Sequence, residues 1–270
     1  MNLIIKVFVL IQVVPMDSKE ETIEFLANIF QGNEKHSDEV AENLKENHMD
    51  GQDPRITTVV CSDSRVMQQD MWSNKMLGKE FTKGVIGNHV NIYTAQGKEE
   101  ISGSIDYIPE HSDTETVISV IGHTGCGAIT AAYNTLKAVE KEGRLEDIEK
   151  MTEKELGEYN GETQGINTDL KLLIDSGLVD DFKQVKEKDV SENEEINFLV
   201  ERNVDNQIRM LIENTDYENT VILGMVYDME GFYEGEHGKL YLTNFEGSTD
   251  KEAFEKEFDN QDSVRTGRIS

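Results

Sequence analysis

The sequence predicts an α/β fold: a single domain with a mostly parallel central sheet flanked by helices, an N-terminal helical arm and a C-terminal hairpin. The β-branched run ITTVVC at 56–61 is typical of a buried strand. Residues 116–142, TVISVIGHTGCGAITAAYNTLKAVEKE, indicate a strand, a glycine-rich turn and an amphipathic helix, the unit that builds parallel sheets. The apolar runs NTVILGMVYD at 219–228 and KLYLTNF at 239–245 flank a glycine-rich acidic loop and predict the hairpin.

The other elements follow from periodicity along the chain. Asp17 or Ser18 can cap a helix at 21–30, ETIEFLANIF, whose apolar residues recur at helical spacing. The stretch EFTKGVIGNHV at 80–90 predicts a second strand that ends in a Gly-Asn turn. Further helices are expected at 37–47, at 103–110, at 169–182, at 192–214 and, as a short one, within MQQDMW at 67–72.

We expect one domain over residues 17–250, in which 141–165 form an acidic surface excursion, and a polar C-terminal tail over 251–270. Residues 1–16 are an apolar extension that is too short to span a membrane. This extension fits the core of a signal peptide, an extra strand or arm, or a coding start at Met16. We expect a cytoplasmic protein, with secretion left open by the apolar extension.

The charge excludes some classes of partner. The chain has 54 acidic and 26 basic residues, a formal net charge of -28. Nucleic acid phosphates and anionic membrane surfaces would repel it. Because the acidic residues are spread along the chain, we interpret them as a solvated coat, which suits a protein that works in high salt.

The only two cysteines, Cys61 and Cys126, each follow an apolar strand, and His123 precedes the second by three residues. Side chains at the carboxyl ends of parallel strands face one crevice, so these three can meet there. Two thiolates and an imidazole suit zinc, and a fourth position left open is typical of catalytic zinc. Asp63 and Arg65 can form a two-pronged ion pair beside it. The same residues also fit buried structural cysteines, a structural ion pair and a phosphate-binding turn.

The motifs CSDSRV at 61–66 and GHTGCGA at 122–128 together resemble the β-class carbonic anhydrases, with the composition of a salt-adapted, archaeal-looking member. The likeness extends over about residues 20 to 245, through the stretches IGNHV, GSIDY, NVDNQIRMLIEN and ILGMVYDMEGFYEGEHGKLYL. Many family members carry Arg-Asn-Ala before the Gly-Asn turn, whereas this chain has Lys-Gly-Val-Ile at 83–86.

The resemblance implies a carbonic anhydrase (carbonate dehydratase) that hydrates CO2 reversibly to bicarbonate and a proton by attack of zinc-bound hydroxide. It implies Zn2+ on Cys61, His123 and Cys126, and Asp63 with Arg65 as the catalytic dyad, where Asp63 can also serve as a fourth ligand in a closed state. A homodimer or a dimer of dimers is implied as well. The alternatives are hydrolysis of carbonyl sulfide or carbon disulfide on the same scaffold, a non-catalytic zinc-binding sensor, and a thiol redox protein with a Cys61–Cys126 bridge.

Overall fold

The structure is a computed structural model that describes residues 23, 27–31, 33–35, 54–67, 71, 79–93, 99–112, 114–159, 165–258 and 264–268. The chain divides into two compact units, 1–51 and 52–270. The described residues of the first unit are helical, in agreement with the helix predicted at 21–30. The extension at 1–16 and the helix predicted at 37–47 lie outside the described residues.

A five-stranded sheet organises the second unit, in the order β2-β1-β5-β6-β7. The first four strands pair in parallel and β7 pairs antiparallel to β6, which confirms the predicted parallel sheet and C-terminal hairpin. A separate two-stranded ladder joins β3 and β4. The strands are β1 Ile56–Cys61, β2 Glu80–Val85, β3 Asn91–Tyr93, β4 Glu99–Ile101, β5 Thr116–His123, β6 Thr220–Asp228 and β7 Lys239–Phe245.

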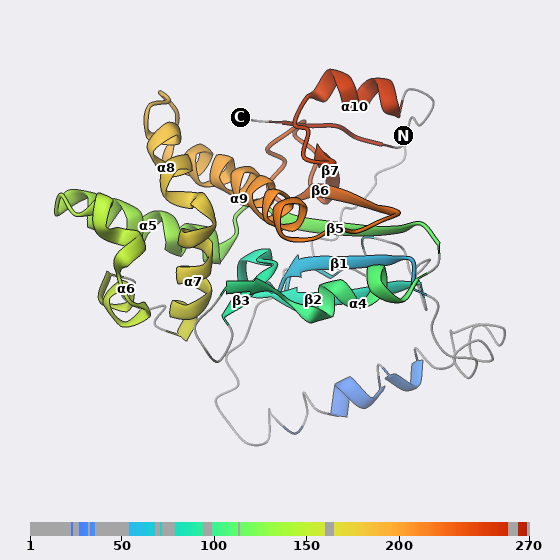
Figure 1. Cartoon of the computed structure of the whole chain (residues 1–270). Coiled ribbons are helices and arrows are strands. Elements are labelled where there is room, and N and C mark those ends of the chain that lie inside the picture. The colour runs from blue at the N-terminus through green and yellow to red at the C-terminus, as the bar shows by residue number, and fades with distance from the viewer. Residues whose placement is uncertain are drawn as a thin grey trace, which may run out of the picture. The chain divides into compact units, whose positions relative to one another are not determined.

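Helices flank this sheet, and α9 crosses it over β5 and β6 with α5 and α8 packed beside it (Figure 1). A capping box between Ser191 and Glu194 starts α9, and a π-helical turn at Ile174–Leu178 joins α7 to α8. In the part of the chain that is described, no helix combines the length and apolarity needed to cross a membrane. The helices are α4 Gly103–His111, α5 Gly127–Lys141, α6 Glu153–Tyr159, α7 Asn167–Leu173, α8 Val179–Lys186, α9 Glu192–Asn214 and α10 Lys251–Glu257.

Two hydrophobic clusters lie on opposite faces of the sheet, because successive strand residues point in opposite directions. Val59 of β1 belongs to the larger cluster together with apolar residues of α5 and α9. Its neighbour Val60 belongs to the smaller one, with Ile121 of β5 and Phe254 of α10. Burial of both faces explains why the central strands β5 and β6 are almost continuously apolar, whereas the edge strand β2, EFTKGV, is more polar and partly exposed.

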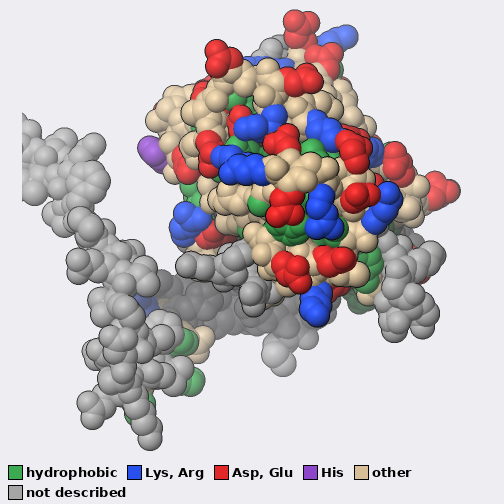
Figure 2. Space-filling view, turned by 90° about the vertical axis from the view of Figure 1, so that its left-hand side faces the viewer, with side chains coloured by type: hydrophobic (Ala, Val, Ile, Leu, Met, Phe, Trp, Pro, Cys, Tyr) green, Lys and Arg blue, Asp and Glu red, His purple; other side chains and the backbone are tan. Residues whose placement is uncertain are grey.

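The described part of the acidic stretch, residues 141–159, is more ordered than its composition indicates. A 3-10 helix at Leu145–Lys150 and α6 place Ile148, Met151 and Leu156 in the interior, while most of the charged side chains stay outside. Three apolar residues are enough to dock the segment. Figure 2 shows acidic and basic side chains interspersed over this side of the molecule, as expected for a solvated coat.

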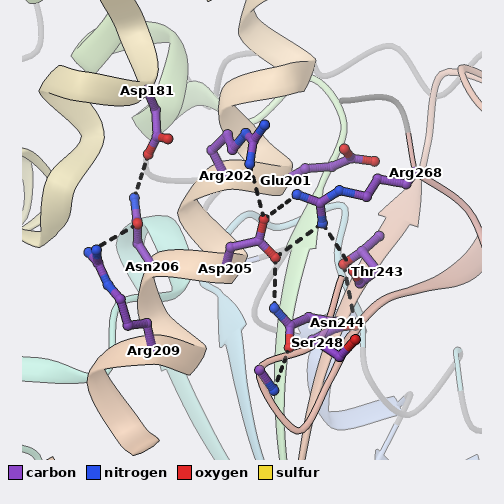
Figure 3. A network of polar contacts seen from close by, with 12 residues as sticks. Asp181, Glu201, Arg202, Asp205, Asn206, Arg209, Thr243, Asn244, Ser248 and Arg268 are labelled. Carbon is purple, nitrogen blue, oxygen red and sulfur yellow. Dashed lines mark hydrogen bonds and ion pairs between the residues drawn. The ribbon is translucent and has the colours of Figure 1, made fainter. Parts of the chain in front are cut away.

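Residues 251–270 are polar, yet two parts of them pack on the domain. Asp250 caps α10, and a strand-like segment at 264–268 pairs in parallel with β7 through Leu242. Arg268 fixes this segment: its guanidinium binds both carboxylate oxygens of Asp205 on α9, at 2.6 and 3.3 Å, and the carbonyl of Thr243 (Figure 3). The free edge of β7 is covered in this way.

Candidate metal centre

Two neighbouring strands bring the predicted ligands together. β1 ends at Cys61 and β5 ends at His123, and the two strands pair in parallel with Val60 beside Ile121. Their carboxyl ends therefore meet at one edge of the sheet. Cys126 follows three residues after His123 and immediately precedes α5.

The three side chains form one buried cluster. Their ligand atoms all lie within 4.8 Å of one another, and the Sγ atoms of Cys61 and Cys126 are 4.0 Å apart. The three residues are at most 6% exposed. Within the described ranges, no other group of three or more His, Cys, Asp or Glu side chains has this arrangement.

The ring of His123 is oriented as a metal ligand would be. Its Nδ1 lies 3.1 Å from the carbonyl oxygen of Thr124, and because a carbonyl only accepts hydrogen bonds, Nδ1 carries the proton. Nε2 therefore presents its lone pair. This atom is buried and has no hydrogen-bond partner among the described residues, which is rare for a buried polar atom. A bound cation would satisfy it.

The surroundings favour a thiolate at Cys61. The hydrogen bond from Cys126, the neighbouring His123 and a backbone hydrogen bond from Gly87 lower the pKa of Cys61 to about 4, against the opposing effect of burial. The same shared hydrogen bond and complete burial raise the pKa of the Cys126 thiol. Since the thiolate is the metal-binding form of cysteine, one ligand is already in that form.

The donor set and its spacing fit zinc. Two sulfurs at about 2.3 Å from a tetrahedral zinc ion would be about 3.8 Å apart, close to the observed 4.0 Å. Two sulfurs and one imidazole nitrogen are ligands that zinc prefers. With three protein ligands, the fourth position would remain for a reacting molecule.

Asp63 and Arg65 lie beside this cluster as a bidentate pair. The arginine donates to the two carboxylate oxygens at 2.9 and 2.7 Å, and the Arg65 backbone N–H donates to Oδ1 at 3.0 Å. These hydrogen bonds lower the pKa of Asp63 to about 2, so the carboxylate stays ionised. Oδ2 of Asp63 is 3.9 Å from Nε2 of His123. The predicted dyad and the predicted ligands are thus adjacent.

The three glycines in and beside the turn that carries His123 and Cys126 differ in how much the structure depends on them. Gly125 has a φ of +64°, which side-chain-bearing residues rarely adopt, and its carbonyl accepts from Arg65 at 3.3 Å. At Gly122, a Cβ atom would lie 2.9 Å from Val204, so glycine lets α9 approach β5 closely. Space is not limiting at Gly127, where a Cβ atom would meet nothing within 4 Å.

Comparison with known proteins identifies the family. The sequence profile of the family described as carbonic anhydrase matches residues 56–239, which is more than half of the chain and contains all five predicted site residues. The chain belongs to the β-class carbonic anhydrase family. A search of curated protein sequences finds no significant relative.

Solved structures of β-class carbonic anhydrases share the fold. The β-carbonic anhydrase CcaA matches with a TM-score of 0.54 at 21% identity, over 84% of this chain and 90% of that one. A tetrameric β-carbonic anhydrase of Sordaria macrospora matches with a TM-score of 0.55 at 18% identity, over 83% and 95%. The enzyme CafA of Aspergillus fumigatus gives 0.54 at 18% identity, over 88% and 98%.

Sequence reasoning missed the polar residues that support the candidate site from α9. Asn197, Asn203 and Gln207 lie on the buried face of that helix. Asn203 donates to the carbonyl of Gly87, and Gln207 accepts from the backbone N–H of Val90. Polar residues recurring on the apolar face of an amphipathic helix are the signal that could have revealed them.

Two further polar side chains hold the turn that carries two of the candidate ligands. Thr124 donates to Asp228, a fully buried carboxylate at the end of β6, and accepts from the backbone N–H groups of Met229 and Glu230. The loop after β6 is therefore attached to the turn between His123 and Cys126.

His89 is buried and lies apart from the ligand cluster. Its ring is hydrogen-bonded to the carbonyl of Asn91 and to the carboxylate of Asp169. Both ring nitrogens are therefore in use, which suits a structural role.

Proposed function

We propose that this protein catalyses the reversible hydration of carbon dioxide to bicarbonate and a proton, with zinc held by Cys61, His123 and Cys126. The observation that carries the proposal is the buried Cys-His-Cys cluster. Nε2 of its histidine has no hydrogen-bond partner among the described residues and lies 3.9 Å from the Asp63 carboxylate. Family membership supports the reaction. Zinc would supply Lewis-acid chemistry that lowers the pKa of water towards about 7.

Asp63 would orient the reacting water. A carboxylate only accepts hydrogen bonds, so it selects the O–H of the nucleophile and directs the oxygen lone pair towards the carbon of CO2. Oδ2 receives one hydrogen bond from Arg65 and has a second lone pair for this purpose. The low pKa of Asp63 keeps it an acceptor at neutral pH.

Arg65 would keep the site open. Because it binds both carboxylate oxygens of Asp63, movement of that carboxylate onto the metal as a fourth ligand would require both hydrogen bonds to break. The same guanidinium donates to the carbonyl of Gly125, which ties the dyad to the turn between His123 and Cys126. We therefore infer an open coordination position at neutral pH.

The initial rate of CO2 hydration tests the proposal, measured in molar KCl near pH 8 with the zinc content determined on the same sample. We expect rapid hydration and about one zinc per chain, both lost on chelation. A zinc-loaded protein without this activity would contradict the proposal. Its rates on carbonyl sulfide and carbon disulfide would then separate another hydrolase from a sensor.

Replacing Asp63 by alanine separates catalysis from metal binding. Loss of a group that orients the nucleophile is expected to reduce the hydration rate by roughly 100-fold or more, with zinc retained. Asp180→Ala is the matched control, because that carboxylate is 80% exposed, lies on the surface of α8 and pairs with Lys183. Full activity in the Asp63 variant would remove Asp63 from the mechanism.

The assembly is proposed to be a homodimer or a dimer of dimers. The Sordaria macrospora enzymes with the same fold are described as tetrameric. Sedimentation in molar KCl tests this part of the proposal, and a monomer at micromolar concentration with full activity would contradict it.

A further inference from the structure

The residue Gly125 is held from several sides, although it is not itself a predicted ligand. Its backbone N–H donates to Oδ1 of Asn197 at 3.0 Å, and its carbonyl accepts from Arg65. Its neighbour Thr124 donates its backbone N–H to the carbonyl of Tyr227 at 3.1 Å. Because Thr124 and Gly125 connect His123 to Cys126, whatever fixes them also fixes the distance between two ligands.

Asn197 accepts the hydrogen bond from the N–H of Gly125 with its side chain and is 1% exposed. Both polar atoms of its side-chain amide form hydrogen bonds: Oδ1 accepts from the N–H of Gly125, and Nδ2 donates to Oε2 of Glu230 at 2.9 Å. An aspartate at this position would keep the acceptor and lose the donor, and an aliphatic residue would lose both. The position thus uses the specific chemistry of an amide.

Glu230, in the loop after β6, contacts the same turn from another side. Its backbone N–H donates to Thr124 and to Asp228, both at 3.1 Å. Its carboxylate lies against Gly125, where an added Cβ atom would be only 2.7 Å from Oε1. Asn197 therefore links the turn to a carboxylate that is already attached to the same turn through its backbone.

We propose that Asn197 is a positioning residue for the metal centre: by bridging Gly125 to Glu230 it holds the spacing of His123 and Cys126. The inference rests on the proposed function, since it concerns the zinc ligands named there. Because Gly125 also anchors Arg65, displacement of the turn would disturb the ligands and the dyad together. Loss of a residue that supports metal ligands typically lowers affinity by roughly 10- to 100-fold.

The test is the zinc dissociation constant of the full chain, measured by competition with a chromophoric chelator, together with the absorption spectrum of the cobalt-substituted protein. The variants are Asn197→Ala and Asn197→Asp, and Asn193→Ala is the matched control. Asn193 is an exposed asparagine on the same helix that contacts the same carboxylate of Glu230, at 3.5 Å. Among the described residues, it forms no hydrogen bond to the turn between His123 and Cys126.

We expect zinc affinity roughly 10- to 100-fold weaker in both Asn197 variants, with an altered cobalt–thiolate spectrum, and unchanged affinity in Asn193→Ala. The double variant Asn197→Asp with Glu230→Gln exchanges donor and acceptor, because the glutamine amide can donate to the new carboxylate. Recovery of affinity in the double variant supports the bridge. The comparison of Asn197→Asp with the double variant also tests the bridge if Asn197→Ala does not fold.

Wild-type zinc affinity and spectrum in the Asn197 variants would overturn the inference, as would an equal loss in Asn193→Ala or no recovery in the double variant. These outcomes differ from a failure of the proposed function. A wild-type chain that binds zinc without hydrating CO2 would refute the function alone, and the affinities would still decide the role of Asn197. A wild-type chain that binds neither zinc nor cobalt would overturn both.

Discussion

Replacement of Gly125 by alanine should weaken the metal centre as well as the fold. Gly125 has a φ of +64°, and a Cβ atom there would lie 2.7 Å from Oε1 of Glu230. The nearest atom is the end of an exposed, flexible side chain, so Glu230 can move away. That movement would break its hydrogen bond to Asn197.

The magnitude follows from two contributions. An L-residue forced into the left-handed region costs about 1–2 kcal/mol. A hydrogen bond to a charged group contributes about 1.5–3 kcal/mol, and the lower end applies because Glu230 is exposed to solvent. We therefore expect a loss of about 3 kcal/mol in the free energy of unfolding.

Gly143→Ala is the matched control for backbone strain. Gly143 has a φ of +70°, and a Cβ atom there would meet nothing within 4 Å. This variant should lose only the stability that the left-handed backbone conformation costs an L-residue, about 1–2 kcal/mol. It should bind zinc normally. Urea unfolding gives the stabilities, and chelator competition gives the zinc affinities. Equal stability loss in the two variants, with unchanged zinc affinity in Gly125→Ala, would refute the reasoning.

Three further predictions concern the rest of the domain. Burial lowers the pKa of Lys83 from 10.5 to about 8, and its Nζ has no hydrogen-bond partner among the described residues. The unfolded chain therefore binds more protons between these values, so the free energy of unfolding should rise with pH from about 8 to about 10.5. Urea titrations at several pH values should show a flatter profile for Lys83→Met. Arg268→Ala should cost about 3 kcal/mol, because it leaves the carboxylate of Asp205, only 16% exposed, without its main partner. Arg265→Ala, which replaces an exposed arginine, should leave the free energy of unfolding nearly unchanged. Equal urea midpoints for Arg268→Ala and Arg265→Ala would contradict this account. Dialysis from molar KCl to low salt should reduce the circular dichroism signal if the acidic coat is a salt adaptation, and an unchanged spectrum would exclude it.

The ligand cluster could be predicted from the sequence because one topological rule places it. Once residues 56–61 and 116–123 are interpreted as parallel strands, their carboxyl ends must lie at one edge of a sheet. Cys61 and His123 then meet without knowledge of any other contact. The pairing of Asp63 with Arg65 could also be predicted, because the two residues are only two positions apart in the sequence.

The supporting contacts could not be predicted because they join segments far apart in the chain. The bond from Asn197 to Gly125 depends on the rotation of α9 about its own axis, and the ion pair between Arg268 and Asp205 depends on where the C-terminal segment docks. Composition also concealed the 3-10 helix at Leu145–Lys150 and α6, since Ile148 and its few apolar neighbours are diluted by charged residues. Periodicity predicts a helix, and it does not by itself predict which polar residue on the helix faces a site.

α9 supports both sides of the candidate centre, and the cost of buried polar groups explains why it does so with amides. Asn197 binds Gly125 beside Cys126, and Asn203 binds the carbonyl of Gly87, whose backbone also forms a hydrogen bond to Cys61. A leucine at either position would pack well and yet leave a buried backbone group without a partner, at about 1–3 kcal/mol each. The amides therefore satisfy backbone groups in the turn that carries His123 and Cys126 and in the turn at Gly87. Turns shaped to bring ligands together give up their own hydrogen bonds, and the helix that packs on them has to supply the partners.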